Sequence, residues 1–370
     1  MDTLRSRRRN SLCHPWLVAG VFALGLTLPS GVTVVQAQSP NATPNQEAVG
    51  TPYELIQAGN AAYQAQNWQE AVAKFEAFLN NYGTDPTVAE AVDQVKPLLA
   101  LCKIRLADYG GAGALITEVL AQPKLEPKLR DELSFWKGVI LLQVQAYEEA
   151  RKAFLAYYQT PEFQQARRVE SILLYGTTFI LENDHKQAAP FFEQQAPRLW
   201  DLSHEAALRA QTLRLNSLLE LNELPEAKAL VATLQPLMDE VTQIVSLHGL
   251  TADLGGRFLD AGDFYSSIFC LQRVWPAQRL LKHQADRIDR IKRELAILSA
   301  RPGGEALVFA KKNVLTRIER EHKAFSASTD FDLGVRMRLG FAYLGLERWR
   351  EAALVLEEAL TLPGDPKQQA

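Results

Sequence analysis

An interval of twelve residues from a glycine to an alanine occurs four times in this chain. The four intervals are 59–71, 138–150, 176–188 and 340–352, and four residues after each alanine stands a large apolar residue, in order Phe75, Phe154, Phe192 and Leu356. This spacing predicts pairs of antiparallel helices, with the small residues at the helix contact and the large residue beside them. Because one such pair cannot bury its apolar stripe alone, the pairs must stack on one another.

Weaker copies of this frame fill the space between the strong ones. If Ala112, Ala227 and Ser267 stand for the alanine, the anchor positions 71, 112, 150, 188, 227 and 267 follow one another at intervals of 38 to 41 residues. An ordinary helical bundle gives no reason for one frame to repeat at a nearly fixed period. We therefore predict an all-α solenoid of about eight helix pairs over residues 51–370. The 85 residues from Ser267 to Ala352 leave room for two further steps of the stack.

The strong copies resemble the tetratricopeptide repeat (TPR). Three of them share an aromatic-x-Glu-Ala motif, which begins at Trp68, Tyr147 and Trp349. The resemblance covers roughly residues 51 to 362 and implies a right-handed superhelical solenoid of antiparallel helix pairs, as in secreted bacterial proteins of this type. Proteins that resemble this one commonly bind peptides or partner helices in a concave groove lined by the first helix of each pair.

Matching each repeat gives a set of groove residues, which the resemblance implies as the partner-binding site. They are Asn60, Tyr63, Gln64, Val139, Leu142, Gln143, Thr177, Ile180, Met337, Phe341 and Leu344. For each apolar member, packing against the next repeat is an equally good interpretation.

The first fifty residues have the pattern of a targeting segment. Four arginines before residue 10 precede an apolar stretch from Trp16 to Leu28, and Val35-Gln-Ala37 provides a small-residue cleavage site. We expect residues 1–37 to be a cleavable signal peptide and residues 38–50 a flexible linker, which places the mature protein in the periplasm or outside the cell. The alternative is an uncleaved membrane anchor, but the apolar stretch is shorter than the ~20 residues that span a bilayer.

Charge and cysteine content restrict the partners and the covalent chemistry. The chain has a net charge of −3, and removal of residues 1–37 takes away four arginines and one aspartate, which leaves a net charge near −6. This balance does not favour nucleic acid, which binds clustered lysine and arginine. Only Cys102 and Cys270 remain after processing. They are several repeats apart, so we expect two buried thiols and no internal disulfide.

Catalytic and metal-binding patterns in the sequence are incomplete. The segment from His204 to Leu208 begins like a zinc-protease motif but has leucine in place of the second histidine. Glu170-Ser171 begins like the motif of lytic transglycosylases, without the Gly-Leu-Met-Gln element that follows in that family, and we interpret Glu170 as an exposed helix residue. We predict no catalytic residues, no metal and no cofactor, and therefore no enzyme.

The region from residue 268 to 325 departs from the repeat pattern. A proline at 276 ends one helix, a long helix follows from Ala277 to Ala300, and Arg301-Pro-Gly-Gly304 separates it from another helix that runs to about Phe325. Our preferred interpretation is a lengthened helix pair within the solenoid. A projecting hairpin or coiled-coil segment that recruits a partner or dimerises is the alternative.

Together these features predict a non-enzymatic protein–protein interaction scaffold of the bacterial cell envelope, with no integral membrane segment after signal cleavage. Two other functions remain open. One is a cell-wall enzyme or its accessory subunit, and the other is a factor that coordinates outer-membrane assembly or an envelope complex.

Overall fold

The computed structural model of the protein describes residues 50–300, 305–328 and 330–362. The expected signal peptide, nearly all of the expected linker and the segment after residue 362 lie outside these ranges. The described chain divides into two compact units, residues 50–164 and residues 165–362, which we treat one at a time.

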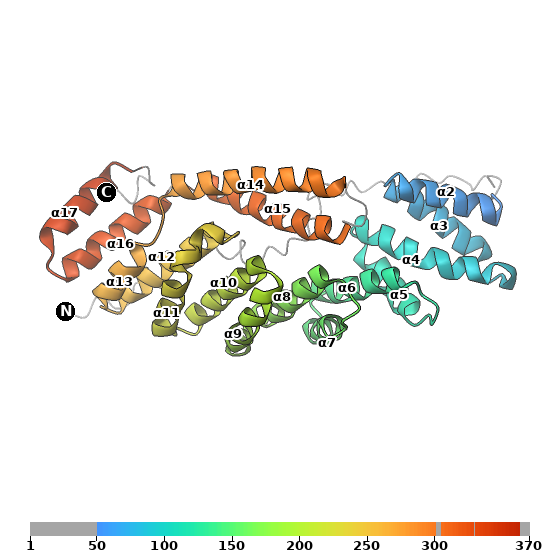
Figure 1. The fold of residues 1–370 in the computed structure, drawn as a ribbon, viewed down its shortest axis with the longest axis horizontal. Helices are drawn as coiled ribbons and strands as arrows, with labels where there is room; N and C mark the ends of the chain where they lie inside the picture. Colours follow the sequence, from blue (N-terminus) through green and yellow to red (C-terminus); the bar gives the residue numbers. More distant parts are fainter. Residues whose placement is uncertain (1–49, 301–304, 329, 363–370) are drawn as a thin grey trace, which may run out of the picture. The chain divides into compact units, whose positions relative to one another are not determined.

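The first unit consists of three helix pairs (Figure 1). The pairs are α2 (Pro52–Gln64) with α3 (Trp68–Tyr82), α4 (Ala89–Arg105) with α5 (Tyr109–Leu120), and α6 (Pro127–Gln143) with α7 (Tyr147–Tyr158). A short 3-10 helix, Pro86–Val88, precedes α4. The second helix of one pair packs on the first helix of the next, α3 on α4 and α5 on α6, so the three pairs stack in chain order.

The second unit contains the other five pairs. They are α8 (Gln165–Leu181) with α9 (His185–Leu202), α10 (His204–Glu220) with α11 (Leu224–Leu234), α12 (Ile244–Asp260) with α13 (Phe264–Leu271), α14 (Ala277–Ser299) with α15 (Glu305–Ser326), and α16 (Phe331–Gly345) with α17 (Trp349–Leu360). The described residues thus form sixteen α-helices in eight antiparallel pairs and no strand, which confirms the predicted all-α solenoid.

The repeat frame makes the contacts that its spacing predicts. A Cβ atom on Gly138 would lie 2.6 Å from the ring of Phe154, and one on Gly340 would lie 2.5 Å from the side chain of Leu356. The anchor Ala150 has no exposed surface. The absent side chain therefore lets the two helix backbones approach until the large residue fills the space between them.

The turn inside the helix pairs follows the same frame. In seven pairs, the residue five positions before the anchor has a left-handed backbone, with φ between 58° and 78°, and these residues are Gln66, Ala107, Gln145, Asn183, Asn222, Gly262 and Glu347. The amide of the next residue donates to a carbonyl in the last turn of the first helix, as from Asn67 to Ala62 at 2.9 Å. Six of the seven residues are not glycine. A left-handed backbone costs energy at a residue with a side chain, so those six turns carry backbone strain.

The pair α14–α15 does not belong to the stack. Helix α13 packs directly on α16, where a Cβ atom on Gly345 would lie 2.4 Å from the ring of Phe264 and Gln272 donates to the Tyr343 hydroxyl at 2.7 Å. The 85 residues after Ser267 therefore hold one further step and an inserted hairpin. The two steps for which these residues leave room are thus one step of the stack, α16 with α17, and one pair of long helices, α14 with α15, that lies outside the direct contact of α13 with α16.

Candidate functional site

The inserted hairpin lies along the first helices of the second unit. In Figure 1, α14 and α15 run along one side of α8, α10 and α12, and α9 and α11 lie on the other side. We call the side that faces the hairpin the inner face. Helix α15 packs on α8 and α12, and α14 packs on α12. The hairpin therefore packs along the inner face and does not project from it.

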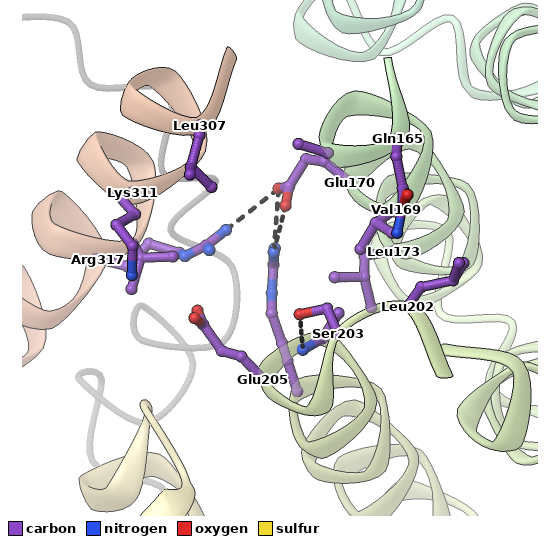
Figure 2. A pocket seen from close by; sticks show the side chains of 14 residues that line it. Gln165, Val169, Glu170, Leu173, Leu202, Ser203, Glu205, Leu307, Lys311 and Arg317 are labelled. Carbon is purple, nitrogen blue, oxygen red and sulfur yellow. Dashed lines mark hydrogen bonds and ion pairs between the residues drawn. The ribbon is translucent and has the colours of Figure 1, made fainter. Parts of the chain in front are cut away.

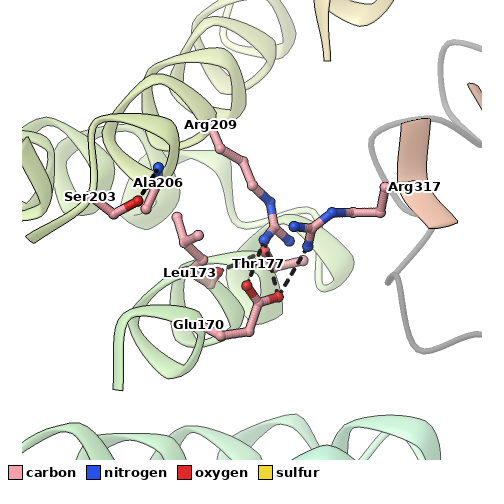
Figure 3. Close-up of polar contacts among 7 residues, drawn as sticks. All are labelled: Glu170, Leu173, Thr177, Ser203, Ala206, Arg209 and Arg317. Carbon is pink, nitrogen blue, oxygen red and sulfur yellow. Dashed lines mark hydrogen bonds and ion pairs between the residues drawn. The ribbon is translucent and has the colours of Figure 1, made fainter. Parts of the chain in front are cut away.

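An ion cluster on the inner face connects three helices (Figure 3). Nη1 of Arg209, from α10, donates to both carboxylate oxygens of Glu170, from α8, at 3.0 and 2.9 Å. Nη1 of Arg317, from α15, donates to the same carboxylate at 3.2 Å. Only 21% of the Glu170 side chain and 5% of the Arg317 side chain are exposed. One carboxylate thus joins two guanidinium groups in a place with little water.

These charges decide the protonation state of the glutamate. Burial alone would raise the pKa of Glu170, but the guanidinium groups of Arg209 and Arg317 outweigh it and hold this pKa at about 2. The carboxylate is therefore ionised throughout the neutral pH range. Removing it would leave two largely buried cations beside each other.

A cavity of about 420 Å³ lies beside the ion cluster (Figure 2). Its apolar lining comes from α8, the end of α9, α10 and α15, and includes Val169, Leu173, Leu202, Ala206, Leu307 and Val314. Its polar lining includes the cluster itself, Glu205 and Lys311. Lys311 is also paired with Glu294 of α14 at 2.5 Å. The hairpin thus covers the inner face without filling the space between them.

A second polar contact fixes the hairpin on α12. Ser246 is the third residue of that helix, so its amide has no acceptor within the helix. The amide donates to the Glu321 carboxyl of α15 at 2.7 Å, the Ser246 hydroxyl donates to the same oxygen, and Gln284 of α14 donates to the other oxygen at 2.5 Å. Burial raises the pKa of Glu321 to about 7, although the contacts with Ser246 and Gln284 oppose this change.

Two of the three residues of the ion cluster occupy one repeat position that the sequence interpretation missed. Glu170 and Arg209 each stand eighteen residues before their anchor alanine, and the same position in the first unit holds Tyr53, Gln94 and Glu132. We call the residues at this position the inner row. The interpretation of Glu170 as an exposed helix residue is wrong. Three of the seven residues that stand eighteen positions before an anchor carry a charge, and this was a signal in the sequence; the position before Ser267 and the position before Ala352 hold Gly249 and Gly334.

In the first unit the inner row lies closer to solvent. Tyr53 is 74% exposed and Gln94 is exposed, while Glu132 accepts a hydrogen bond from Arg105 at 3.3 Å with 21% of its side chain exposed. Arg105 stands seven residues before its anchor, a position that Gln64 and Gln143 share in the neighbouring repeats. Eleven residues separate the two positions along a helix, which places them on nearly the same face.

The structure distributes the predicted groove residues over three environments. Gln64, Gln143 and Phe341 are exposed; Asn60, Tyr63, Met337 and Leu344 are half-buried; Val139, Leu142, Thr177 and Ile180 are buried. The side chain of Tyr63 packs on the apolar core of the first unit with its ring 5.5 Å from that of Trp68, and burial raises its pKa. The buried members pack within the solenoid in this conformation, and the two exposed glutamines lie beside the inner row.

Other features bear on binding and chemistry. Cys102 and Cys270 are free and buried, and burial raises their pKa values to about 11 and about 12. Over the described ranges, no three histidine, cysteine, aspartate or glutamate side chains are grouped so as to hold a metal ion. Within the same ranges, no helix has the length and apolar character needed to cross a membrane.

The sequence matches no family model and no curated protein. Among solved structures, the chain is similar to a tetratricopeptide repeat protein from Parabacteroides merdae, with 12% identity, a TM-score of 0.42, and coverage of 86% of this chain and 96% of that one. It is also similar to the TPR domain of P58(IPK), with 14% identity, a TM-score of 0.26, and coverage of 86% and 95%. A third similar structure is the APC/C hetero-tetramer Cut9–Hcn1, with 13% identity, a TM-score of 0.31, and coverage of 84% and 66%. The TPR-type helix pairs of this chain are identified from contacts within the chain itself, between its glycine, alanine and phenylalanine residues.

Proposed function

We propose that this protein is a non-enzymatic interaction scaffold of the bacterial cell envelope, which binds a peptide or partner protein along the inner faces of its first helices. The observation that carries the proposal is the contact between the inner face of α8, α10 and α12 and a helical hairpin. That face binds the hairpin through Glu170 and the Ser246 amide, and the repeat position of Glu170 holds Tyr53, Gln94 and Glu132 in the first unit.

In the first unit, the proposed contact surface consists of the inner row and the exposed residues beside it. Tyr53 is a large, rigid aromatic side chain of a type enriched at the energetic centres of interfaces, and Gln64 and Gln143 offer hydrogen-bond donors and acceptors. Many weak contacts of this kind along a stacked array of helices add up to useful affinity.

The charge state of Glu170 disfavours this residue as the catalytic acid of a cell-wall hydrolase. Cleavage of a glycosidic bond needs a carboxylic acid that is protonated near neutral pH. With a pKa of about 2 and two arginine partners, Glu170 has no proton to give.

Partner binding can be tested with the mature protein immobilised and exposed to a periplasmic extract of its own cells. The variant with Tyr53→Ala and Gln143→Ala should lose most of the captured partner, because both side chains are exposed on the proposed surface. A control variant with Gln69→Ala and Gln159→Ala changes an exposed residue of α3 and the exposed residue that follows α7, and it should capture the partner as well as the wild type. Equal capture by both variants would show that the surface is assigned wrongly.

Export is tested separately. If residues 1–37 are a signal peptide, the intact mass of the protein from the periplasm should correspond to a chain that begins at Gln38. A periplasmic protein that retains Met1 would contradict the cleavage, and a protein found only in the cytoplasm would contradict the proposed location.

A further inference from the structure

The α14–α15 hairpin occupies the inner face of the second unit as a bound helix would. Arg317 reaches Glu170 of α8, and Glu321, one helical turn later, reaches the Ser246 amide at the beginning of α12. Arg287 of α14 adds a contact with the hydroxyl of Thr242 at 3.0 Å. The face thus recognises a cation and, one turn away, a hydrogen-bond acceptor.

The solenoid is continuous without this hairpin. Helix α13 packs on α16 directly, so the stack from α8 to α17 does not pass through α14 or α15. The hairpin in turn has an apolar core of its own, formed by Ile288, Ile291, Leu295, Val314 and Ile318. Its ion pairs, Lys292 with Glu319 at 2.9 Å and Lys311 with Glu294 at 2.5 Å, join its two helices to each other. The two helices of the hairpin are therefore held to each other by contacts that do not involve the inner face.

The hairpin is attached to the unit by two different kinds of contact. At its root, Leu280 and Phe325 belong to the main apolar core of the unit. Along the inner face the contacts are polar and comprise the ion cluster, the hydrogen bonds of Glu321, the contact of Arg287 with Thr242, and that of His283 with the Asp239 carbonyl at 3.2 Å. The cavity of about 420 Å³ lies between hairpin and solenoid. Polar contacts around an incompletely filled space separate at lower cost than a packed apolar interface. The root is therefore a pivot, and the remainder of the hairpin can leave the face.

We propose that the inner face of α8, α10 and α12 is a binding surface for an amphipathic helix of a partner protein, and that the α14–α15 hairpin is its displaceable occupant. The partner helix presents an arginine to Glu170 and, four residues later, a carboxylate or amide to the Ser246 amide. Apolar side chains of the same helix enter the cavity beside Val169 and Leu173. This inference rests on the proposed scaffold function and specifies one of its partners.

The test uses the full mature chain and a fluorescent peptide with the sequence of residues 305–326 as the probe. In the Arg317→Ala protein, the hairpin loses its partner on α8 while Glu170, Arg209 and Ser246 remain. The peptide should bind this protein at least about tenfold more tightly than the wild type, because apparent affinity falls with the fraction of molecules whose surface is covered. Fluorescence anisotropy gives both dissociation constants.

Two controls separate specific binding from general adhesion. The Arg320→Ala protein loses an exposed arginine of the same helix and should bind the peptide as weakly as the wild type. A peptide with Arg317→Ala should not bind the opened protein. Equal binding of both peptides would overturn the inference. It would also be overturned if the α15 amides of the Arg317→Ala protein lost their protection from hydrogen exchange and this protein still did not bind the peptide.

A hairpin that stays docked in the variants would also overturn the inference. If α15 keeps full protection from exchange in both the Arg317→Ala protein and the protein with Arg317→Ala and Glu321→Ala, the hairpin is a fixed part of the fold and the inference fails. The capture experiment with Tyr53 and Gln143 concerns the first unit only. Its result therefore tells failure of this inference apart from failure of the scaffold function.

Discussion

Glu321 should make the stability of the second unit depend on pH in a direction opposite to that of most carboxylates. Its pKa is about 7 in the folded protein, against an ordinary value of 4.5, because it is buried where α15 meets α12. Between these two pH values, the folded protein holds a proton that the unfolded chain has released. Stability from this residue is therefore fully present below about pH 4.5 and is lost as the pH rises to about 7.

The Glu321→Gln substitution removes this ionisation and keeps the shape of the side chain. The new amide oxygen can still accept from Ser246. The new amide nitrogen takes the place of the oxygen that accepts from Gln284, so it can donate to the Gln284 oxygen, which has no hydrogen-bond partner in the described structure, once the Gln284 amide turns over. From the difference between about 7 and 4.5, at about 1.36 kcal/mol per pKa unit, charging Glu321 costs about 3 kcal/mol at pH 8.5. The free energy of unfolding of the variant should therefore exceed that of the wild type by about 2–3 kcal/mol at that pH, and by little at pH 4.

Urea titrations of the wild type and the variant at several pH values from 4 to 8.5 measure this difference. The free-energy gap between the two proteins should grow from pH 4.5 to 7 and stay constant above. A gap that does not change with pH, or a variant that is less stable than the wild type at pH 8.5, would refute the reasoning.

Two further predictions concern the repeat frame. Ala107→Gly, at a left-handed turn position, should stabilise the first unit by up to about 1 kcal/mol, whereas Ala61→Gly, exposed within α2, should destabilise it by about the same amount. Gly138→Ala should cost about 1–3 kcal/mol because its Cβ would overlap Phe154, whereas Gly110→Ala, with open space around it, should not destabilise. Thermal and urea unfolding measure the stability of all four variants. The frame would be contradicted if Ala107→Gly and Ala61→Gly changed stability alike, or if Gly138→Ala and Gly110→Ala did.

The sequence predicts those parts of the fold that depend on short spacings. The frame of glycine, anchor and large apolar residue describes contacts within one helix pair, so it could be read from four strong copies. It also continues further than we recognised. Gly255 stands twelve residues before Ser267, and its missing Cβ would lie 2.7 Å from Leu271, so that repeat keeps its glycine contact without the alanine.

The position of the hairpin could not be predicted in this way. Helix α14 carries apolar residues at helical spacing, and that pattern is the same whether they pack on a neighbouring repeat or on α15. The pairing of Glu170 with Arg317 joins residues 147 positions apart and leaves no local pattern. Burial of the predicted groove residues is also a long-range property, since Val139 and Thr177 become inaccessible only when neighbouring helices pack around them.

The coupling free energy between Glu170 and Arg317 tests most directly whether the hairpin is docked on the inner face. A double-mutant cycle with Glu170→Gln and Arg317→Gln, measured by urea unfolding at neutral pH, isolates the interaction between α8 and α15. We expect a coupling free energy of about 1–3 kcal/mol, because both side chains are largely buried. The same cycle at Glu132 and Arg105, a more exposed pair within the first unit, should give less than about 1 kcal/mol. A coupling between Glu170 and Arg317 within about 0.3 kcal/mol of zero would mean that the hairpin does not lie on the inner face.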